Sequence, residues 1–164
     1  MLIAIASDLH DNLANWASCH KYLQQQGVST LLFCGDLTSV NTLKKIVQEF
    51  SGDIFMIAGN AELYTKADTD KMPRLHFLGR YGQTTIADQK IGLIHEPAYK
   101  QALLREHPNL KYLFYGHTHK PWISNENGII YANPGNLGGL IYPASFAVLD
   151  TDNDKLELKI LNTL

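Results

Sequence analysis

Short apolar runs rich in β-branched residues alternate along the chain with segments of helical spacing. Each run is four or five residues long, which is typical of a buried strand. We predict such strands over residues 2–6, 31–34, 54–58, 91–94 and 112–115. Between the first three, apolar residues recur every three or four positions over 13–23 and 40–50, as on one face of a helix. This alternation predicts βαβ units in a largely parallel sheet.

The pattern changes after residue 80. Strand-like runs separated by polar turns occupy residues 84–87, 91–94, 129–132, 146–149 and 156–161. They predict hairpins and a second sheet. One helix is expected over 98–106, ended by Pro108. We therefore predict the α/β class, a two-sheet α/β sandwich of α-β-β-α layers formed by a single domain over residues 1–164.

Composition narrows the class of protein. The 164-residue chain is 45% hydrophobic and 18% charged, as in a globular protein, and its net charge of −2 argues against a broad surface for nucleic acid or anionic membrane. Cys19 and Cys34 have neither the number nor the spacing of a disulfide framework. No apolar run reaches the ~18 residues of a spanning helix, and no targeting segment is visible. We expect a cytoplasmic protein with neither nucleic-acid nor membrane partners.

Five of the predicted strands end in side chains that can bind metals. The carboxyl ends of parallel strands meet at one edge of a sheet, where ligand sites are usually built, so these side chains should converge. They are Asp8, His10, Asp36, Asn60, His95, His117 and His119. Carboxylate, imidazole and amide-oxygen donors suit Mn, Fe, Zn, Co or Ni. Seven ligands exceed one tetrahedral ion, but two ions ~3.5–4 Å apart would use them all and are common machinery for phosphoester hydrolysis.

Taken singly, most of these residues have a simpler explanation. A lone Asp or Asn after a strand is more often a helix cap or turn former, and a lone His95 is more often a buried, hydrogen-bonded histidine. His117-Thr118-His119 differs, because packing hardly explains two imidazoles two positions apart just past a strand. The five motifs together favour a metal centre.

The order of these motifs resembles that of the calcineurin-like metallophosphoesterase superfamily, since the chain carries Asp8-x-His10, Gly35-Asp36, Gly59-Asn60, His95 and Gly116-His117-x-His119. The short length and the segment Asn133-Pro134-Gly135-Asn136 are most similar to its small single-domain phosphodiesterase branch. The resemblance covers nearly the whole chain. A metallo-β-lactamase would continue its His-x-His pair with Asp-His, where this chain has Pro121 and Trp122, so that family is rejected.

The resemblance implies the metallo-dependent phosphatase fold and a dinuclear metal centre. It places Asp8, His10 and His119 on one metal, Asn60, His95 and His117 on the other, and Asp36 between both. Asp36, Asn60 and His95 would also take part in catalysis. A hydroxide bridging the metals would attack phosphorus in line. Mn is the favoured ion, with Fe, Ni, Co or Zn as alternatives. The substrate would be a small phosphoester. The resemblance also makes a homodimer a possible assembly of this chain.

The chain departs from the family pattern beside this site. Ala61 and Glu62 stand where many relatives carry a His that protonates the leaving group, which favours diesters with good leaving groups. Glu62 could partly take over that role, although a solvated acid in the first turn of a helix is the commoner situation. Asp11 and Glu96 add negative charge that would either repel a phosphate or hydrogen-bond the ligand histidines.

Two asparagines flank the predicted site. Asn12 would cap the helix that begins beside Asp8, and Asn133 belongs to a loop that would shape the substrate approach, although it can equally be an ordinary turn residue. Two other functions stay open. One is a non-catalytic protein-binding scaffold on the same fold, like a retromer subunit of the superfamily, against which the intact His117 and His119 argue. The other is a phosphomonoesterase or nucleotide hydrolase.

Overall fold

Eleven strands form two sheets in the computed structural model, which describes residues 1–164. The first sheet contains β1 (Leu2–Ala6), β2 (Thr30–Phe33), β3 (Asp53–Met56), β4 (Leu75–Phe77), β10 (Ser145–Asp150) and β11 (Lys155–Ile160). The second contains β5 (Tyr81–Ile86), β6 (Gln89–Ile94), β7 (Tyr112–Phe114), β8 (Trp122–Glu126) and β9 (Ile129–Asn133). The helices are α1 (Leu13–Gln25), α2 (Val40–Glu49), α3 (Lys66–Thr69) and α4 (Lys100–Glu106), with 3-10 turns at Pro97–Tyr99 and Leu161–Thr163.

Strand pairing explains why several strand ends meet. The order is β11-β10-β1-β2-β3-β4 in the first sheet and β5-β6-β7-β9-β8 in the second. β1 to β4 pair in parallel, as do β6, β7 and β9. Crossovers through α1 and α2 connect the first three strands, which is the βαβ arrangement that the strand–helix alternation predicts.

The two long helices begin where the sequence supplies a cap. The Ser39 side chain accepts a hydrogen bond from the Thr42 backbone N–H at 3.2 Å, which satisfies one free donor at the start of α2. Leu43, Ile46 and Val47 then follow at helical spacing, and all three are buried. One face of α2 therefore packs on the first sheet while the other meets solvent.

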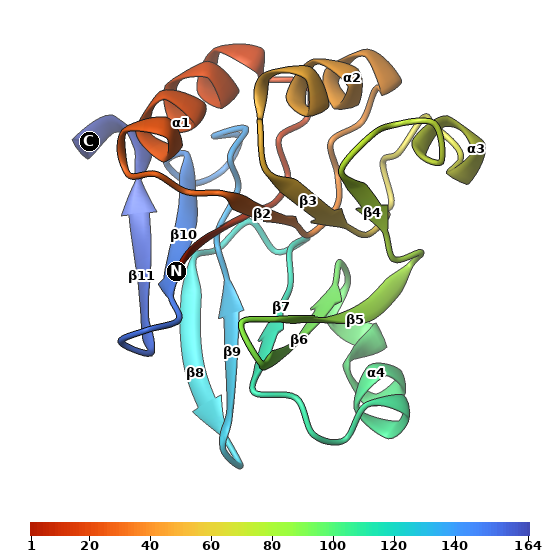
Figure 1. Cartoon of the computed structure of the whole chain (residues 1–164), viewed down its shortest axis with the longest axis vertical. Helices are drawn as coiled ribbons and strands as arrows, with labels where there is room; N and C mark the ends of the chain where they lie inside the picture. The colour runs from red at the N-terminus through yellow and green to blue at the C-terminus, as the bar shows by residue number, and fades with distance from the viewer.

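Alternation along the central strands builds the layers of the core. Along β1, Ala4 and Ala6 belong to the apolar cluster shared with α1 and α2, whereas Ile3 and Ile5 belong to the cluster between the two sheets. A third, smaller cluster around Leu103 lies between the second sheet and α4. Figure 1 shows α1 and α2 on one side of the paired sheets and α4 on the other. The α-β-β-α sandwich is thus confirmed.

Details of the strand pattern differ from the prediction. β10 and β11 return to the first sheet, where β10 pairs antiparallel with β1. The predicted helix at 98–106 begins as the 3-10 turn, and α4 proper starts at Lys100. The sequence analysis does not predict β4, which is only three residues long, or β8, in which no residue is buried and polar residues fill the last three positions.

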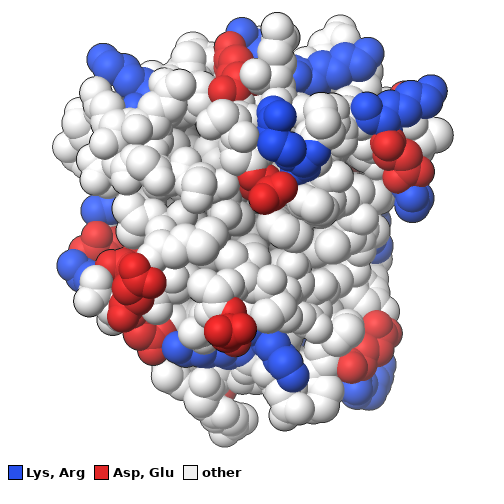
Figure 2. Space-filling view, viewed as in Figure 1, with Lys and Arg blue, Asp and Glu red and all other residues white.

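The surface carries charges of both signs. On the face in Figure 2, acidic and basic side chains lie in small neighbouring groups separated by uncharged areas. None of the helices combines the length and the apolar character that crossing a membrane requires.

Candidate metal centre

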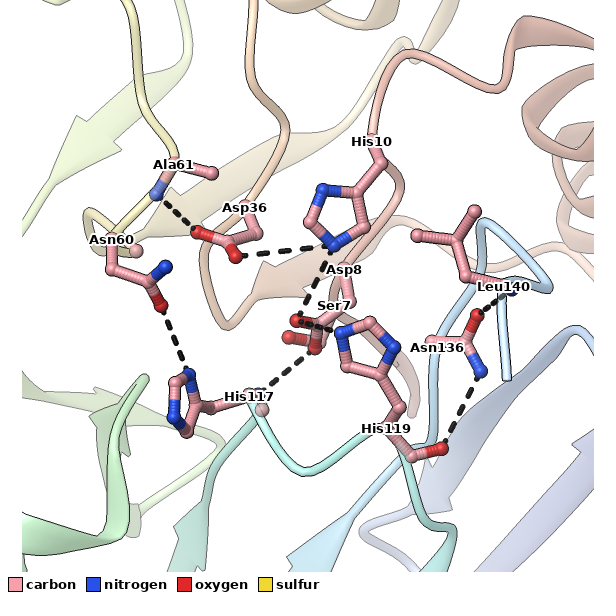
Figure 3. Close-up of polar contacts among 12 residues, drawn as sticks. Ser7, Asp8, His10, Asp36, Asn60, Ala61, His117, His119, Asn136 and Leu140 are labelled. Carbon is pink, nitrogen blue, oxygen red and sulfur yellow. Dashed lines mark hydrogen bonds and ion pairs between the residues drawn. The ribbon is translucent and has the colours of Figure 1, made fainter. Parts of the chain in front are cut away.

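The loops that follow β1, β2, β3, β6 and β7 bring the seven predicted ligands to one site. Figure 3 labels all of them except His95. His119 Nε2 lies 3.2 Å from Asp8 Oδ1, and His95 Nε2 lies 3.4 Å from Asp36 Oδ2. His10 Nε2 lies 3.9 Å from both Asp8 Oδ1 and Asp36 Oδ2. The first three loops come from one sheet and the last two from the other. The site therefore forms where the carboxyl ends of both sheets meet, and the predicted convergence is confirmed.

Asn60 completes the other half of the site. Its Oδ1 lies 2.9 Å from His95 Nε2 and 2.9 Å from His117 Nδ1. The rings of these two histidines meet edge to face with centroids 5.2 Å apart. These are the three residues that the family resemblance places on one metal, and Asp36 lies between them and His10.

Distances between donor atoms also group the residues in a second way. Asp8, His10 and His119 form one potential metal cluster, and Asp8, Asp36 and His95 form another. The first cluster matches the assignment implied by the resemblance. The second brings Asp8 as well as Asp36 close to His95, so the two halves of the site share their carboxylates.

Three buried polar atoms of the site have no hydrogen-bond partner: Asp8 Oδ1, His10 Nε2 and His119 Nδ1. An unpaired buried polar group costs about 1–3 kcal/mol, and native proteins that tolerate one usually bind an ion or water there. Carboxylate oxygens and imidazole nitrogens are the donors that divalent transition metals prefer. The residues present therefore fit metal ions.

The backbone is strained where the ligands stand. Five of the seven have positive φ values, which are 53° at Asp8, 47° at His10, 58° at Asp36, 66° at His117 and 60° at His119. This conformation costs about 1–2 kcal/mol for a residue with a Cβ, and such strain gathers at functional sites. Packing gives no reason for five such turns around one point, whereas aiming five side chains inward does.

Glycines let the ligand loops approach one another. A Cβ on Gly59 would lie 2.0 Å from Asp36 Oδ1, and a Cβ on Gly116 would lie 2.0 Å from Ser7 Oγ and 2.7 Å from Asp8 Oδ2. Each of these glycines directly precedes a predicted ligand. The Gly-Asn and Gly-His motifs therefore have a steric reason, because any larger residue would displace a carboxylate of the site.

Comparison with known proteins agrees with this geometry. The calcineurin-like phosphoesterase superfamily domain matches residues 1–154. The chain belongs to this superfamily. It is 24% identical to phosphodiesterase MJ0936 of Methanocaldococcus jannaschii, with 93% of this chain and 94% of that protein covered. It is 28% identical to a probable metallophosphoesterase of Methanothermobacter thermautotrophicus, with 99% and 93% covered.

A solved structure shares the whole fold of this phosphoesterase domain. It is described as a novel archaeal phosphodiesterase, superimposes with a TM-score of 0.86 and is 22% identical, and the match covers 98% of this chain and 99% of that one. At this identity the likeness establishes the fold, which is the two-sheet sandwich expected of the superfamily.

Hydrogen bonding fixes how this phosphoesterase domain presents His95. Its Nδ1 lies 2.7 Å from the backbone carbonyl oxygen of Cys34. Nδ1 can donate its proton there, so Nε2 is the nitrogen that faces Asp36 and Asn60: in the protonated ring it donates to Asp36, and in the neutral ring it is free to bind a metal. Sequence patterns cannot reveal this partner, because any residue at position 34 supplies the same carbonyl.

Burial and charge oppose each other at the carboxylates. Burial raises the pKa of Asp8, although Ser7 and neighbouring histidines partly counter it. Burial also disfavours ionised Asp36, but hydrogen bonds from His95 and the Ala61 N–H outweigh that effect and lower its pKa. The pKa of His95 is raised, because the bond to Asp36 and the nearby negative charges outweigh burial. Two carboxylates enclosed this closely favour a cation between them.

Glu62 differs from its sequence interpretation. It precedes α3 and is half-buried, so the description as a solvated acid in the first turn of a helix is wrong. Its carboxylate accepts hydrogen bonds from the backbone N–H groups of Leu37 and Thr38 at 3.3 Å and of Gly59 at 3.2 Å. The Tyr64 hydroxyl donates a further bond at 3.0 Å. Glu62 therefore ties the loop after β2 to the loop after β3.

The two flanking asparagines act on neighbouring backbone. Asn12 accepts a hydrogen bond from the Asn15 N–H at 3.1 Å, so the predicted cap is confirmed, and its amide donates to the Gly138 carbonyl at 2.9 Å. The Asn133 amide donates to the Gly116 carbonyl and to Thr118 Oγ1, both at 2.9 Å. Asn133 thus holds the loop that carries two of the ligand histidines.

The extra acids beside the site are engaged elsewhere. Asp11 accepts hydrogen bonds from Ser39 N at 3.1 Å and Ser39 Oγ at 2.8 Å. Glu96 forms an ion pair with Arg80 at 3.3 Å. Neither is hydrogen-bonded to a ligand histidine, so the prediction that they orient those histidines is wrong.

Arg80 is a residue beside the site that the sequence pattern does not single out. Its Nη1 also donates to the Gly59 carbonyl at 2.8 Å, next to Asn60.

Proposed function

We propose that this member of the calcineurin-like phosphoesterase superfamily is a phosphodiesterase that uses two divalent metal ions. One observation carries the proposal: seven metal-ligand side chains from five strand ends converge, and three of their buried nitrogen and oxygen atoms have no hydrogen-bond partner. If these side chains served only to pack the fold, their unpaired buried atoms would lower the stability of the protein. A phosphoesterase centre uses every one of them.

The ligand roles in this proposal are those that the family resemblance implies. Asp8, His10 and His119 would hold one ion, Asn60, His95 and His117 would hold the other, and Asp36 would contact both. When bound, such ions lower the pKa of coordinated water toward ~7 and neutralise charge on the phosphoryl oxygens. The protein contributes rigid placement, because strained turns fix the ligands and the Cys34 carbonyl orients His95.

The neighbourhood of Asn60 supports a diester as substrate. Ala61 has no proton to give from its side chain, and its backbone N–H is donated to Asp36 Oδ1 at 2.9 Å. The Glu62 carboxylate is occupied by four donors. A leaving group here must depart without an acid from these residues, which favours small diesters with good leaving groups over alkyl monoesters.

Hydrolysis of model esters tests this proposal. We expect metal-stripped protein to regain hydrolysis of bis(p-nitrophenyl) phosphate when Mn²⁺ is added, with weaker activity on p-nitrophenyl phosphate. Asp36→Asn should lower the diester rate by roughly 100-fold or more, because loss of a ligand exceeds the 10–100-fold effect of an outer partner. Circular dichroism checks that the variant stays folded.

Other outcomes would select the alternatives. Near-wild-type turnover by Asp36→Asn would remove the bridging role, and a preference for the monoester would favour a phosphomonoesterase. If neither ester is hydrolysed when Mn, Fe, Ni, Co and Zn are each supplied, the non-catalytic scaffold is favoured. The complete set of ligand side chains argues against that scaffold. Mn as the working ion, a homodimer and a cytoplasmic location stay predictions. Light scattering tests the homodimer.

A further inference from the structure

The outer face of the second sheet is only partly covered by helix. α4 packs against β5 and β6, and in Figure 1 it lies toward that side of the sheet, away from β8 and β9. A groove of about 250 Å³ opens beside it, between the start of α4 and β8. The proposed metal centre does not use any of the side chains that line this groove.

Aromatic rings and one ion pair line the groove. Tyr115, Trp122 and Tyr131 provide the rings, and Trp122 is 52% exposed on an edge strand. Lys100 Nζ lies 3.8 Å from the centroid of the Tyr131 ring and 2.8 Å from Glu126 Oε2. The groove therefore offers flat apolar surfaces together with a donor and an acceptor.

The groove lies beside the loop that carries two of the proposed metal ligands. Thr118 lines it and stands between His117 and His119 in the sequence. Consecutive Cα atoms are 3.8 Å apart, so the groove begins within one residue of two proposed ligands. Thr118 is itself held in place, because its Oγ1 accepts a hydrogen bond from Asn133 at 2.9 Å.

We infer that this groove binds an aromatic heterocycle, such as a nucleobase, that is carried by the diester hydrolysed at the metal centre. The inference rests on the proposed function and adds the substrate class. A base has a π face that can stack on Trp122 and a polar edge that can pair with Lys100 and Glu126. An alkyl chain would form no hydrogen bond with either group. The volume of about 250 Å³ lies just below that of ordinary drug-sized sites and suits one ring system.

The first test needs no metal. Trp16 is fully buried whereas Trp122 is 52% exposed, so adenosine should quench the fluorescence of Trp122 selectively and saturably. By calorimetry, Trp122→Ala should weaken adenosine binding roughly 10-fold, as for the loss of a stacked base, and Trp122→Phe should restore most of it. Tyr142→Ala is the matched control, since Tyr142 is 39% exposed and does not line the groove. Ribose 5-phosphate should give no quenching.

The second test uses the Mn²⁺-loaded enzyme. Trp122→Ala should raise KM roughly 10-fold for the p-nitrophenyl ester of thymidine 5′-phosphate and leave kcat/KM for methyl p-nitrophenyl phosphate nearly unchanged. If adenosine does not bind and KM stays the same while both esters are hydrolysed, the groove proposal is overturned and the phosphodiesterase stands. If adenosine binds at Trp122 but neither ester is hydrolysed, the groove is supported as a base site and the proposed function fails.

Discussion

The Glu62 carboxylate links two loops that carry proposed metal ligands, one containing Asp36 and the other Asn60. Replacing Glu62 by Gln turns one acceptor oxygen into a donor and leaves backbone N–H groups of the loops unpaired. We expect Glu62→Gln to lower the free energy of unfolding by about 1–3 kcal/mol. Urea denaturation of the metal-free protein measures this loss.

Glu96→Gln is the matched control, because Glu96 only pairs with Arg80 in a partly exposed contact at 3.3 Å. Glu96→Gln should lower the free energy of unfolding by no more than about 1 kcal/mol. The same pair of variants separates two roles of Glu62. A fall in kcat for poor leaving groups with unchanged stability would identify Glu62 as a proton donor and contradict the linking role.

At the scale of elements, one hydrogen bond joins the two long helices. Trp16 Nε1 of α1 donates to Glu49 Oε2 at the end of α2 at 2.7 Å. An acid in the last turn of a helix is unfavourable toward the helix dipole, so its acceptor role explains its place better than helix preference does. Lys45 Nζ also donates to Glu49 at 2.6 Å.

Removing this acceptor should loosen the packing of α1 on α2. Glu49→Ala leaves the Trp16 N–H without its partner, and we expect a loss of about 1–3 kcal/mol in unfolding free energy. Lys45→Ala keeps that partner and should cost about 0.5 kcal/mol, as an exposed helical pair does. Equal losses in both variants would show that the Trp16 bond contributes nothing of its own.

The Glu49 contribution should depend on pH. The hydrogen bond from Lys45 and that from Trp16 outweigh burial and lower the pKa of Glu49 below its ordinary value of 4.5. A carboxyl with a lowered folded-state pKa stabilises the protein above its unfolded-state pKa, and this stability is lost as pH falls through the lower value. The difference in unfolding free energy between wild type and Glu49→Gln should therefore be largest above about pH 5 and shrink below pH 4.5.

At the scale of the whole molecule, folding and metal binding are separable. None of the seven proposed ligands belongs to the three apolar clusters of the core. Protein treated with EDTA should therefore stay folded. Mn²⁺ at 100 times its Kd adds about 2.7 kcal/mol per ion, which corresponds to roughly 5–11 °C in Tm for a chain of this size.

Scanning calorimetry with and without Mn²⁺ measures this shift. Asp36→Asn serves as the control and should show a smaller shift, because it removes the carboxylate that lies between the two halves of the site. Unfolding of the EDTA-treated protein would contradict the separation, and an equal Mn²⁺ shift in the variant would place the bound ion elsewhere.

The sequence alone predicted the α-β-β-α sandwich and the residues of the candidate site. Both predictions rest on local signals. Alternating burial marks strands such as Leu2–Ala6, and polar residues directly after such strands are placed at one edge by parallel pairing. The pair His117 and His119 is the strongest single signal for a metal site in the sequence, because imidazoles two positions apart are seldom needed for packing.

Only the tertiary structure decided the features that depend on partners distant in the chain. β10 pairs with β1 because their apolar faces share two core layers, although about 140 residues separate them. Glu62 links two loops, and Cys34 orients His95 through a backbone carbonyl that every residue type possesses. Local patterns report which face of an element is buried. They do not report which distant backbone group a side chain will contact, and such contacts give Glu62 and His95 their roles.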